Sequence, residues 1–156
     1  MKRVTMILIL FSVVSCVKKF NTNKTDKFDD YELVSLADIT NNPEFFDNEK
    51  IALKGYFSFD FELSIISNNV DMTKNVWIDF AFNKGLVDSN NADLLDGDLR
   101  FDYSGKEIWV KGTFVLKDKG HLSLSKGTLT DVTYFEILQT NRIYQVESMV
   151  VGNGSN

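Results

Sequence analysis

Residues 106–116, KEIWVKGTFVL, decide the fold class because apolar and polar side chains alternate along them. One face of this segment carries Ile108, Val110, Gly112, Phe114 and Leu116. A period of two is typical of a β-strand that is buried on one side. The sequence therefore predicts a strand here, with a hydrophobic core behind it.

Four further segments before and after this strand show strand-like patterns. In residues 50–57 the buried face would carry Ile51, Leu53, Gly55 and Phe57. In residues 76–82 it would carry Val76, Ile78, Phe80 and Phe82. Residues 61–66 predict another strand, and residues 121–124 with 129–138 predict the last one. The last strand is expected to break near Gly127, because a glycine within a strand often marks a bulge or a bend.

Short helices are expected at three places. Ser35 and Asp38 have the spacing of a capping box, which predicts a helical turn from residue 35. Asn42 followed by Pro43 predicts a second turn, with Phe45 and Phe46 packed on the core. The third lies in the acidic segment 83–105, where Leu94 and Leu95 predict a short helix with Ser89 as its cap.

Five strands with a helix-sized insertion after the third have the order of an OB-fold, a partly open five-stranded β-barrel. The sequence thus predicts a mainly β, five-stranded OB-like barrel with short helices over residues 31–140. A β-sandwich would require about seven strands, which is more than the pattern provides. Residues 141–156 are expected to form a partly disordered C-terminal extension.

The N-terminus has the features of a bacterial lipoprotein signal. Lys2 and Arg3 precede an apolar run over residues 6–14, which is too short to cross a bilayer. The sequence VVSC at residues 13–16 resembles a lipobox, which implies cleavage after residue 15 and acylation of Cys16. Residues 1–15 would then be the signal peptide, and residues 16–30 a lipidated N-terminus and flexible spacer. This implies a membrane-anchored protein of the cell envelope, with membrane lipid as its partner through Cys16.

A second resemblance concerns the body of the chain. Residues 112–114 (GTF), 119–122 (KGHL), Gly127 and Val132, together with residues 54–56 (KGY), resemble OB-fold-like proteins of the bacterial envelope. The resemblance covers roughly residues 33–138. It implies the fold and carries over no activity.

Composition limits the chemistry of the site. The 156 residues include one Cys and one His, which excludes a disulfide framework and a zinc cluster of Cys and His. Net charge is −5, and it becomes −7 once Lys2 and Arg3 are removed. Such a charge repels polyanions, so no nucleic-acid partner is expected. No motif for a catalytic site or a cofactor is present, and none is predicted.

The candidate ligand-binding residues are Trp77, Trp109, Lys111 and His121. Trp77 and Trp109 alternate with core residues and so point away from the predicted interior, as does Lys111. Outward aromatic side chains on an OB-fold can stack against a ligand, whereas packing under a neighbouring segment is the structural alternative. Lys111 has the same parity as Asp79, so a cross-strand ion pair between them is another structural alternative.

His121 is the only histidine, and it could act as a ligand-binding residue or a general base. The structural alternative is a turn residue whose imidazole bonds to the neighbouring backbone. The acidic run at residues 88–93, with Asp96, Asp98 and Asp102, lacks the spacing of an EF-hand and is expected to be a solvated loop rather than a calcium site.

These observations favour a non-catalytic binding or assembly module of the cell envelope, with an envelope protein or glycan as its partner. One alternative is a small enzyme acting on an envelope polymer, with His121 and an acid such as Asp118 as partners. A single-stranded nucleic-acid binder is the third reading, and the acidic charge disfavours it.

Overall fold

The computed structural model describes residues 18–22, 30–68, 72–80, 85–96 and 99–138. It is mainly β, with one largely antiparallel sheet and two short α-helices. The strands are β1 (Lys19–Asn21), β2 (Glu32–Val34), β3 (Lys50–Asp60), β4 (Leu63–Ser67), β5 (Asn75–Ile78), β6 (Glu107–Val115) and β7 (Thr128–Leu138). The helices are α1 (Leu36–Asn41) and α2 (Leu99–Asp102), with 3-10 turns η2 (Pro43–Phe46) and η3 (His121–Ser123).

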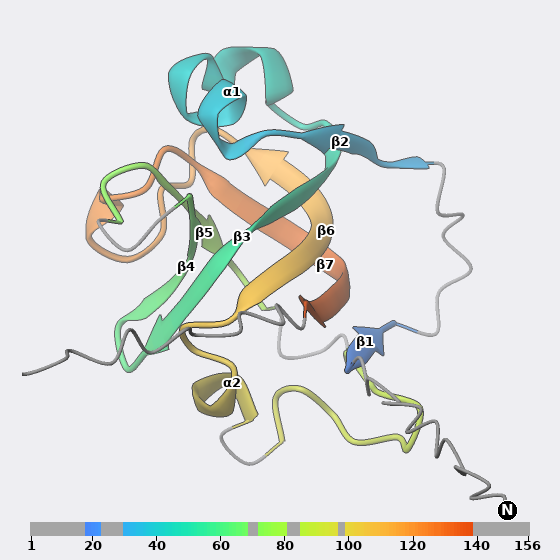
Figure 1. Cartoon of the computed structure of the whole chain (residues 1–156). Helices are drawn as coiled ribbons and strands as arrows, with labels where there is room; N and C mark the ends of the chain where they lie inside the picture. The colour runs from blue at the N-terminus through green and yellow to red at the C-terminus, as the bar shows by residue number, and fades with distance from the viewer. Residues whose placement is uncertain (1–17, 23–29, 69–71, 81–84, 97–98, 139–156) are drawn as a thin grey trace, which may run out of the picture.

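Five of the strands form a ring. β3 pairs with β4, β4 with β5, β5 with β7, β7 with β6, and β6 again with β3. The β5–β7 pair is parallel and the other four pairs are antiparallel. Figure 1 shows this ring with α1 at one end and α2 at the other.

The predicted alternation explains the core inside the ring. Ile51, Leu53 and Phe57 of β3 are fully buried, as are Ile108, Val110 and Phe114 of β6. Val76, Ile78 and Phe80 are also buried, while Phe82 lies outside the described residues. Burial of such side chains contributes about 1.5–3 kcal/mol each, which makes the ring interior the main source of stability.

Gly112 lies where β6 and β7 shift register. A Cβ at this position would lie 2.5 Å from the carbonyl oxygen of Thr130, so only glycine allows the two backbones to approach this closely. β7 begins after Gly127, and the irregularity lies further along it, where residues 131–133 of β7 stand opposite Gly112 alone and Asp131 has a positive φ of 48°.

The turns before β3 follow the sequence signals. Ser35 Oγ accepts the Asp38 N–H at 3.0 Å and donates to the Asp38 carboxylate at 2.6 Å, which caps α1. Pro43 begins η2 as predicted. Phe46 packs on the core, but Phe45 is 75% exposed, so the expectation that both rings anchor this turn is wrong for Phe45.

Several other elements differ from the prediction. Residues 121–123 form the turn η3 instead of a strand, because Gly120 has a positive φ of 65° that ends any extended run. The helix of the acidic segment is α2, at residues 99–102, and not a helix capped by Ser89. β2, which was not predicted, pairs with β3 in parallel. It has only three residues, which are too few to show the two-residue alternation of a strand.

β1 changes the reading of the N-terminal segment. Lys19–Asn21 lies within the range assigned to the spacer, yet it pairs with residues 134–136 of β7. Phe20 is fully buried in the core cluster. Residues 23–29 and 139–156, with most of the predicted spacer and the C-terminal extension, lie outside the described residues, as does the signal peptide.

Candidate functional site

A groove of about 500 Å³ opens beside the end of β5. Its walls come from the turn between β3 and β4, from the end of β5, from α2 and from η3. The lining residues are Phe59, Asp60, Phe61, Glu62, Leu63, Ser64, Trp77, Ile78, Asp79, Phe80, Arg100, Phe101 and His121.

Aromatic rings form one wall of the groove. Phe59 lies 4.8 Å from Phe101 in an edge-to-face arrangement, and the Arg100 guanidinium stacks 4.5 Å above the Phe59 ring. These contacts fasten α2 to β3. Phe61, at the turn, is 96% exposed, and Phe101 is 40% exposed. Large exposed rings beside a hollow are typical of a binding surface.

Trp77 stands at the opposite wall, against the connection between β6 and β7. A Cβ on Gly120 would lie 2.3 Å from Cγ of the Trp77 ring, so the glycine backbone packs directly on the indole. The Asp118 carboxylate accepts the Gly120 N–H at 3.0 Å and fixes this turn. The position of Trp77 in the groove therefore depends on the turn that precedes His121.

The rim carries mostly negative charge. Asp60, Glu62 and Asp79 are exposed carboxylates, against the single cation of Arg100. The His121 ring lies 3.9 Å from the Glu62 carboxylate, with both side chains exposed. An exposed pair of this kind contributes little to stability. Asp118, which the enzyme alternative names beside His121, accepts the Gly120 N–H, and Glu62 is the carboxylate that lies beside the His121 ring.

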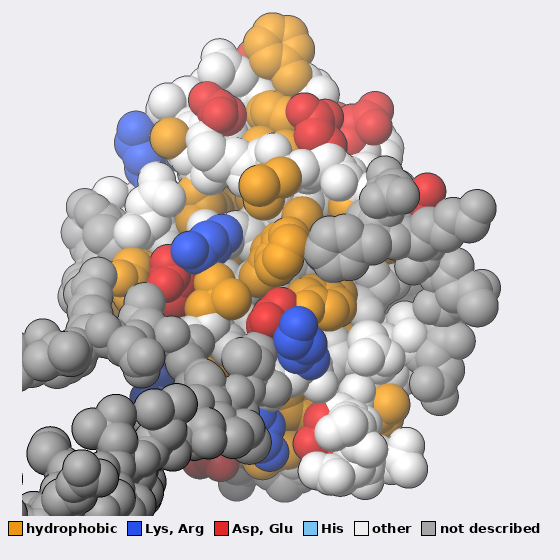
Figure 2. Space-filling view, turned by 45° about the vertical axis from the view of Figure 1, so that its right-hand side comes forward, with side chains coloured by type: hydrophobic (Ala, Val, Ile, Leu, Met, Phe, Trp, Pro, Cys, Tyr) orange, Lys and Arg blue, Asp and Glu red, His pale blue; other side chains and the backbone are white. Residues whose placement is uncertain are grey.

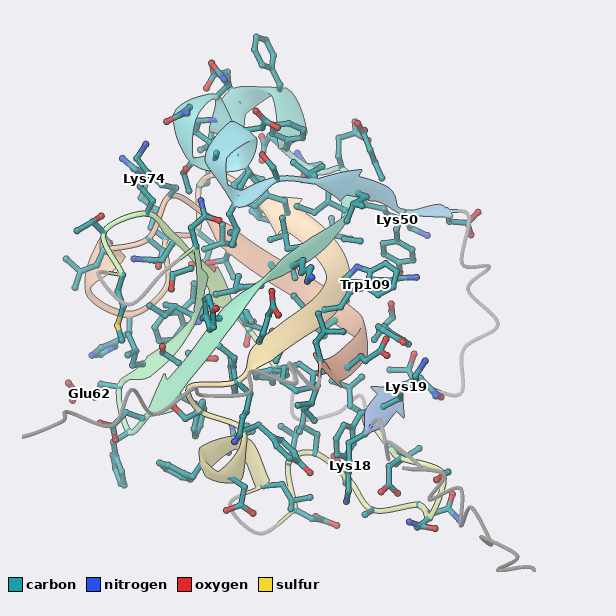
Figure 3. The ribbon with its side chains drawn as sticks, viewed as in Figure 1. Lys18, Lys19, Lys50, Glu62, Lys74 and Trp109 are labelled. Carbon is teal, nitrogen blue, oxygen red and sulfur yellow. The ribbon has the colours of Figure 1, made fainter. Side chains whose placement is uncertain are left out.

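The predicted site residues separate into two groups. Trp77 and His121 line the groove, whereas Trp109 and Lys111 belong to a different face, formed by β6 and β7. The ion pair of Lys111 with Asp79 is wrong, because β6 pairs with β3 and β7 and not with β5. Figure 3 shows Trp109 and Glu62 on opposite sides of the molecule.

Lys111 is 3% exposed, and its ammonium lies among three aromatic rings. The ring centroids are 5.1 Å away for Tyr134, 5.4 Å for Trp109 and 5.6 Å for Tyr31. Cation–π attraction of this kind is worth about 0.5–2 kcal/mol. Figure 2 brings this side forward and shows hydrophobic side chains lying between charged ones. Here the packing alternative describes Trp109 and Lys111 better than a ligand does.

The Tyr134 hydroxyl extends this cluster towards β1. It donates a hydrogen bond to the Glu136 carboxylate, which also pairs with Lys19 at 3.2 Å. Burial raises the pKa of Tyr134, and the hydrogen bond to the Glu136 carboxylate raises it further. Tyr31 bonds to Thr133 at 2.9 Å. The cluster therefore joins the segments on both sides of residues 23–29 to β7.

Most groove residues were missed from the sequence, among them Phe61, Arg100 and Phe101. Phe61 was assigned to a strand, and the other two stand in a segment without periodicity. The one available signal was a pair of aromatic residues two positions apart, Phe59 and Phe61, and such alternation by itself predicts one face of a strand rather than a turn.

The acidic segment binds its own backbone. Asp88 accepts the N–H groups of Ala92 at 3.0 Å and Asn90 at 2.8 Å, and these bonds, with a smaller contribution from Lys18, lower the pKa of Asp88. Asp93 accepts the Leu95 N–H at 2.9 Å. Among the described residues, no three acidic, His or Cys side chains are placed to hold a metal ion. Asp98 lies outside the described residues.

No helix in the described part of the chain is long and apolar enough to cross a membrane. Cys16 lies outside the described residues. Comparison with protein-family models, curated proteins and solved structures finds no match.

Proposed function

We propose that the protein is a lipoprotein of the bacterial envelope, anchored through acyl chains on Cys16, that binds another envelope protein in the groove without catalysing a reaction. The observation that carries the proposal is the groove, in which the exposed rings of Phe61 and Phe101 face a hollow beside Trp77. Concave sites that combine aromatic surface with a few polar groups are typical of ligand binding. The lipobox-like VVSC sequence supports the anchor.

We further infer that the five-stranded ring is a barrel of the OB type. Support comes from the ring order β3-β4-β5-β7-β6, from the parallel β5–β7 pair and from the insertion that carries α2 between β5 and β6. OB-folds bind ligands on their second and third strands and on the loops after the first and fourth. In this chain the corresponding elements are β4, β5, the turn at Phe61 and the connection at His121, and all four contribute to the groove.

The charge of the groove favours a neutral or cationic ligand segment. Asp60, Glu62 and Asp79 outnumber Arg100, so phosphate backbones are repelled, whereas Lys or Arg side chains gain both carboxylate and ring contacts. A protein segment with apolar and basic side chains fits this surface. A glycan is the alternative ligand, since rings and carboxylates also suit sugars. The single-stranded nucleic-acid alternative gains nothing from these charges.

Site-specific photocrosslinking in intact cells tests this function. A photoreactive phenylalanine analogue at position 61 should give a discrete protein adduct, and Trp77→Ala should remove it. The matched control is the same analogue at position 45, which is also exposed but lies on η2, outside the groove. Equal adducts from both positions would refute the groove as the site. An adduct that contains no second protein would refute the protein partner and favour a glycan as the ligand.

The enzyme alternative has its own test. If the protein acts on an envelope polymer through His121, then His121→Ala should abolish turnover of that polymer while the adduct at position 61 persists.

A further inference from the structure

Strand β1 is unusually close to the proposed lipid attachment. Lys19, its first residue, follows Cys16 by three positions, so this stretch of chain spans at most about 11 Å. A free chain over residues 16–30 would have a root-mean-square span of about 20 Å and would leave the domain to rotate. The contacts that hold β1 therefore determine the orientation of the domain relative to the membrane.

β1 is held by backbone hydrogen bonds along both edges. Ile137 donates to the carbonyl of Lys18 at 3.0 Å, and Thr22 donates to the carbonyl of Thr133 at 3.1 Å. On the other edge, Asn21 and Val87 exchange two bonds at 2.9 and 3.0 Å. β7 pairs with β5 near its start and with β1 near its end, so β1 completes an edge that β5 leaves open.

Side chains hold β1 as well. Phe20 is fully buried, and its ring contacts those of Phe135 and Tyr103, with centroids 6.4 and 5.8 Å away. Lys18 and Lys19 form ion pairs with the largely buried carboxylates of Asp88 and Glu136. Both lysine side chains remain about half exposed, at 51% and 52%.

We propose that β1 is a clamp that holds the domain directly against the bilayer in one orientation, with the groove turned away from the membrane. This rests on the proposed lipidation of Cys16. Figure 3 shows Lys18 and Lys19 on one side of the molecule and Glu62, at the rim of the groove, on the other. The surface that faces the bilayer is the one around Lys18 and Lys19, because these residues follow Cys16 by two and three positions and belong to the docked segment.

Energy transfer to the membrane surface tests the clamp. The mature, acylated full-length protein is placed in vesicles of phosphatidylethanolamine and phosphatidylglycerol that carry a headgroup acceptor. Acylation of Cys16 leaves a single introduced cysteine for the donor, at Asn90→Cys near β1 or at Glu62→Cys at the groove. We expect strong transfer from position 90 and weak transfer from position 62. Equal transfer from both positions would refute the clamp.

Two variants separate the clamp from simple proximity. An insertion of ten Gly and Ser residues before Lys18 leaves β1 in place but lengthens the tether by about 17 Å root-mean-square, and the difference between the two labels should disappear. Phe20→Asp should release β1 and give the same loss. Phe45→Asp, at an exposed ring on η2, is the matched control and should keep the difference.

The mass of the mature N-terminus distinguishes the two proposals. If the acyl mass on Cys16 is missing, the proposed function fails and the clamp fails with it. If the acyl mass is present and transfer from the two labels is equal, only the clamp fails.

Discussion

Phe20→Ala tests whether β1 belongs to the folded domain or merely to a tether. The ring is fully buried among Phe135, Tyr103 and the rest of the core cluster. Truncation of a buried phenylalanine to alanine costs about 3–5 kcal/mol, from lost transfer energy and from the cavity left behind. Against a total stability of about 5–15 kcal/mol for a domain of this kind, that loss is large.

The position of β1 sets an upper limit on this cost. β1 pairs only with β7 as a strand, so the domain can release β1 and stay folded when docking becomes unfavourable. The cost of Phe20→Ala then cannot exceed the free energy of β1 docking. A chain that begins at residue 30 measures that docking free energy directly, and we expect its cost to equal or exceed that of Phe20→Ala.

Urea denaturation monitored by tryptophan fluorescence measures both the cost of Phe20→Ala and the docking free energy of β1, with the chain lacking residues 1–15 as the reference. The matched control is Phe45→Ala, which removes the same atoms from a ring that is 75% exposed and should change stability by less than about 0.5 kcal/mol. A Phe20→Ala cost as small as that of the control would refute the docking of β1. Such a result would restore a flexible tether and remove the clamp.

Three further predictions concern other parts of the molecule. Gly120→Ala should displace Trp77, because the new Cβ would meet the indole at 2.3 Å, and it should both shift Trp77 fluorescence in a Trp109→Phe background and reduce crosslinking from the groove. Ser35→Ala should cost about 1 kcal/mol in urea denaturation, since it removes the cap of α1. Because folding lowers the pKa of Asp88, the ionised carboxylate stabilises the fold fully above its ordinary pKa of 3.8, and this contribution is lost as the pH falls below that value. Asp88→Asn should therefore make the free energy of unfolding, measured by urea denaturation, depend less steeply on pH in the acid range.

The ring could be predicted from sequence because its strands are long and buried on one side. β3 and β6 span 11 and 9 residues, enough for several repeats of a two-residue period. β1 and β2 have three residues each, so neither shows a period, and their pairing depends on distant residues of β7 and β3. Residues 121–124 have apolar alternation but follow Gly120, whose positive φ turns the chain into η3.

The groove could be predicted only in part. The alternation of side chains along β5 correctly indicated that Trp77 lies outside the core, but alternation does not show which other segments of the chain lie beside it. Phe61, Arg100 and His121 come from three connections that are far apart in sequence, and the closure of the ring brings them together. Only the three-dimensional path of the chain contains that information.

The different positions of Trp77 and Trp109 follow from which part of the outer surface the chain covers. Both residues have outward parity, and each belongs to a strand that pairs with β7. Near Trp109 the chain returns with Tyr31, so Tyr31, Tyr134 and the indole enclose the Lys111 ammonium. At Trp77 the neighbouring connections instead stand beside the ring, with α2 on one side and the Gly120 turn on the other, and a hollow remains between them. The segments that cover the outer surface at Trp109 are those that lead from the proposed anchor, so the same chain path that fastens the domain leaves the groove open on the opposite side.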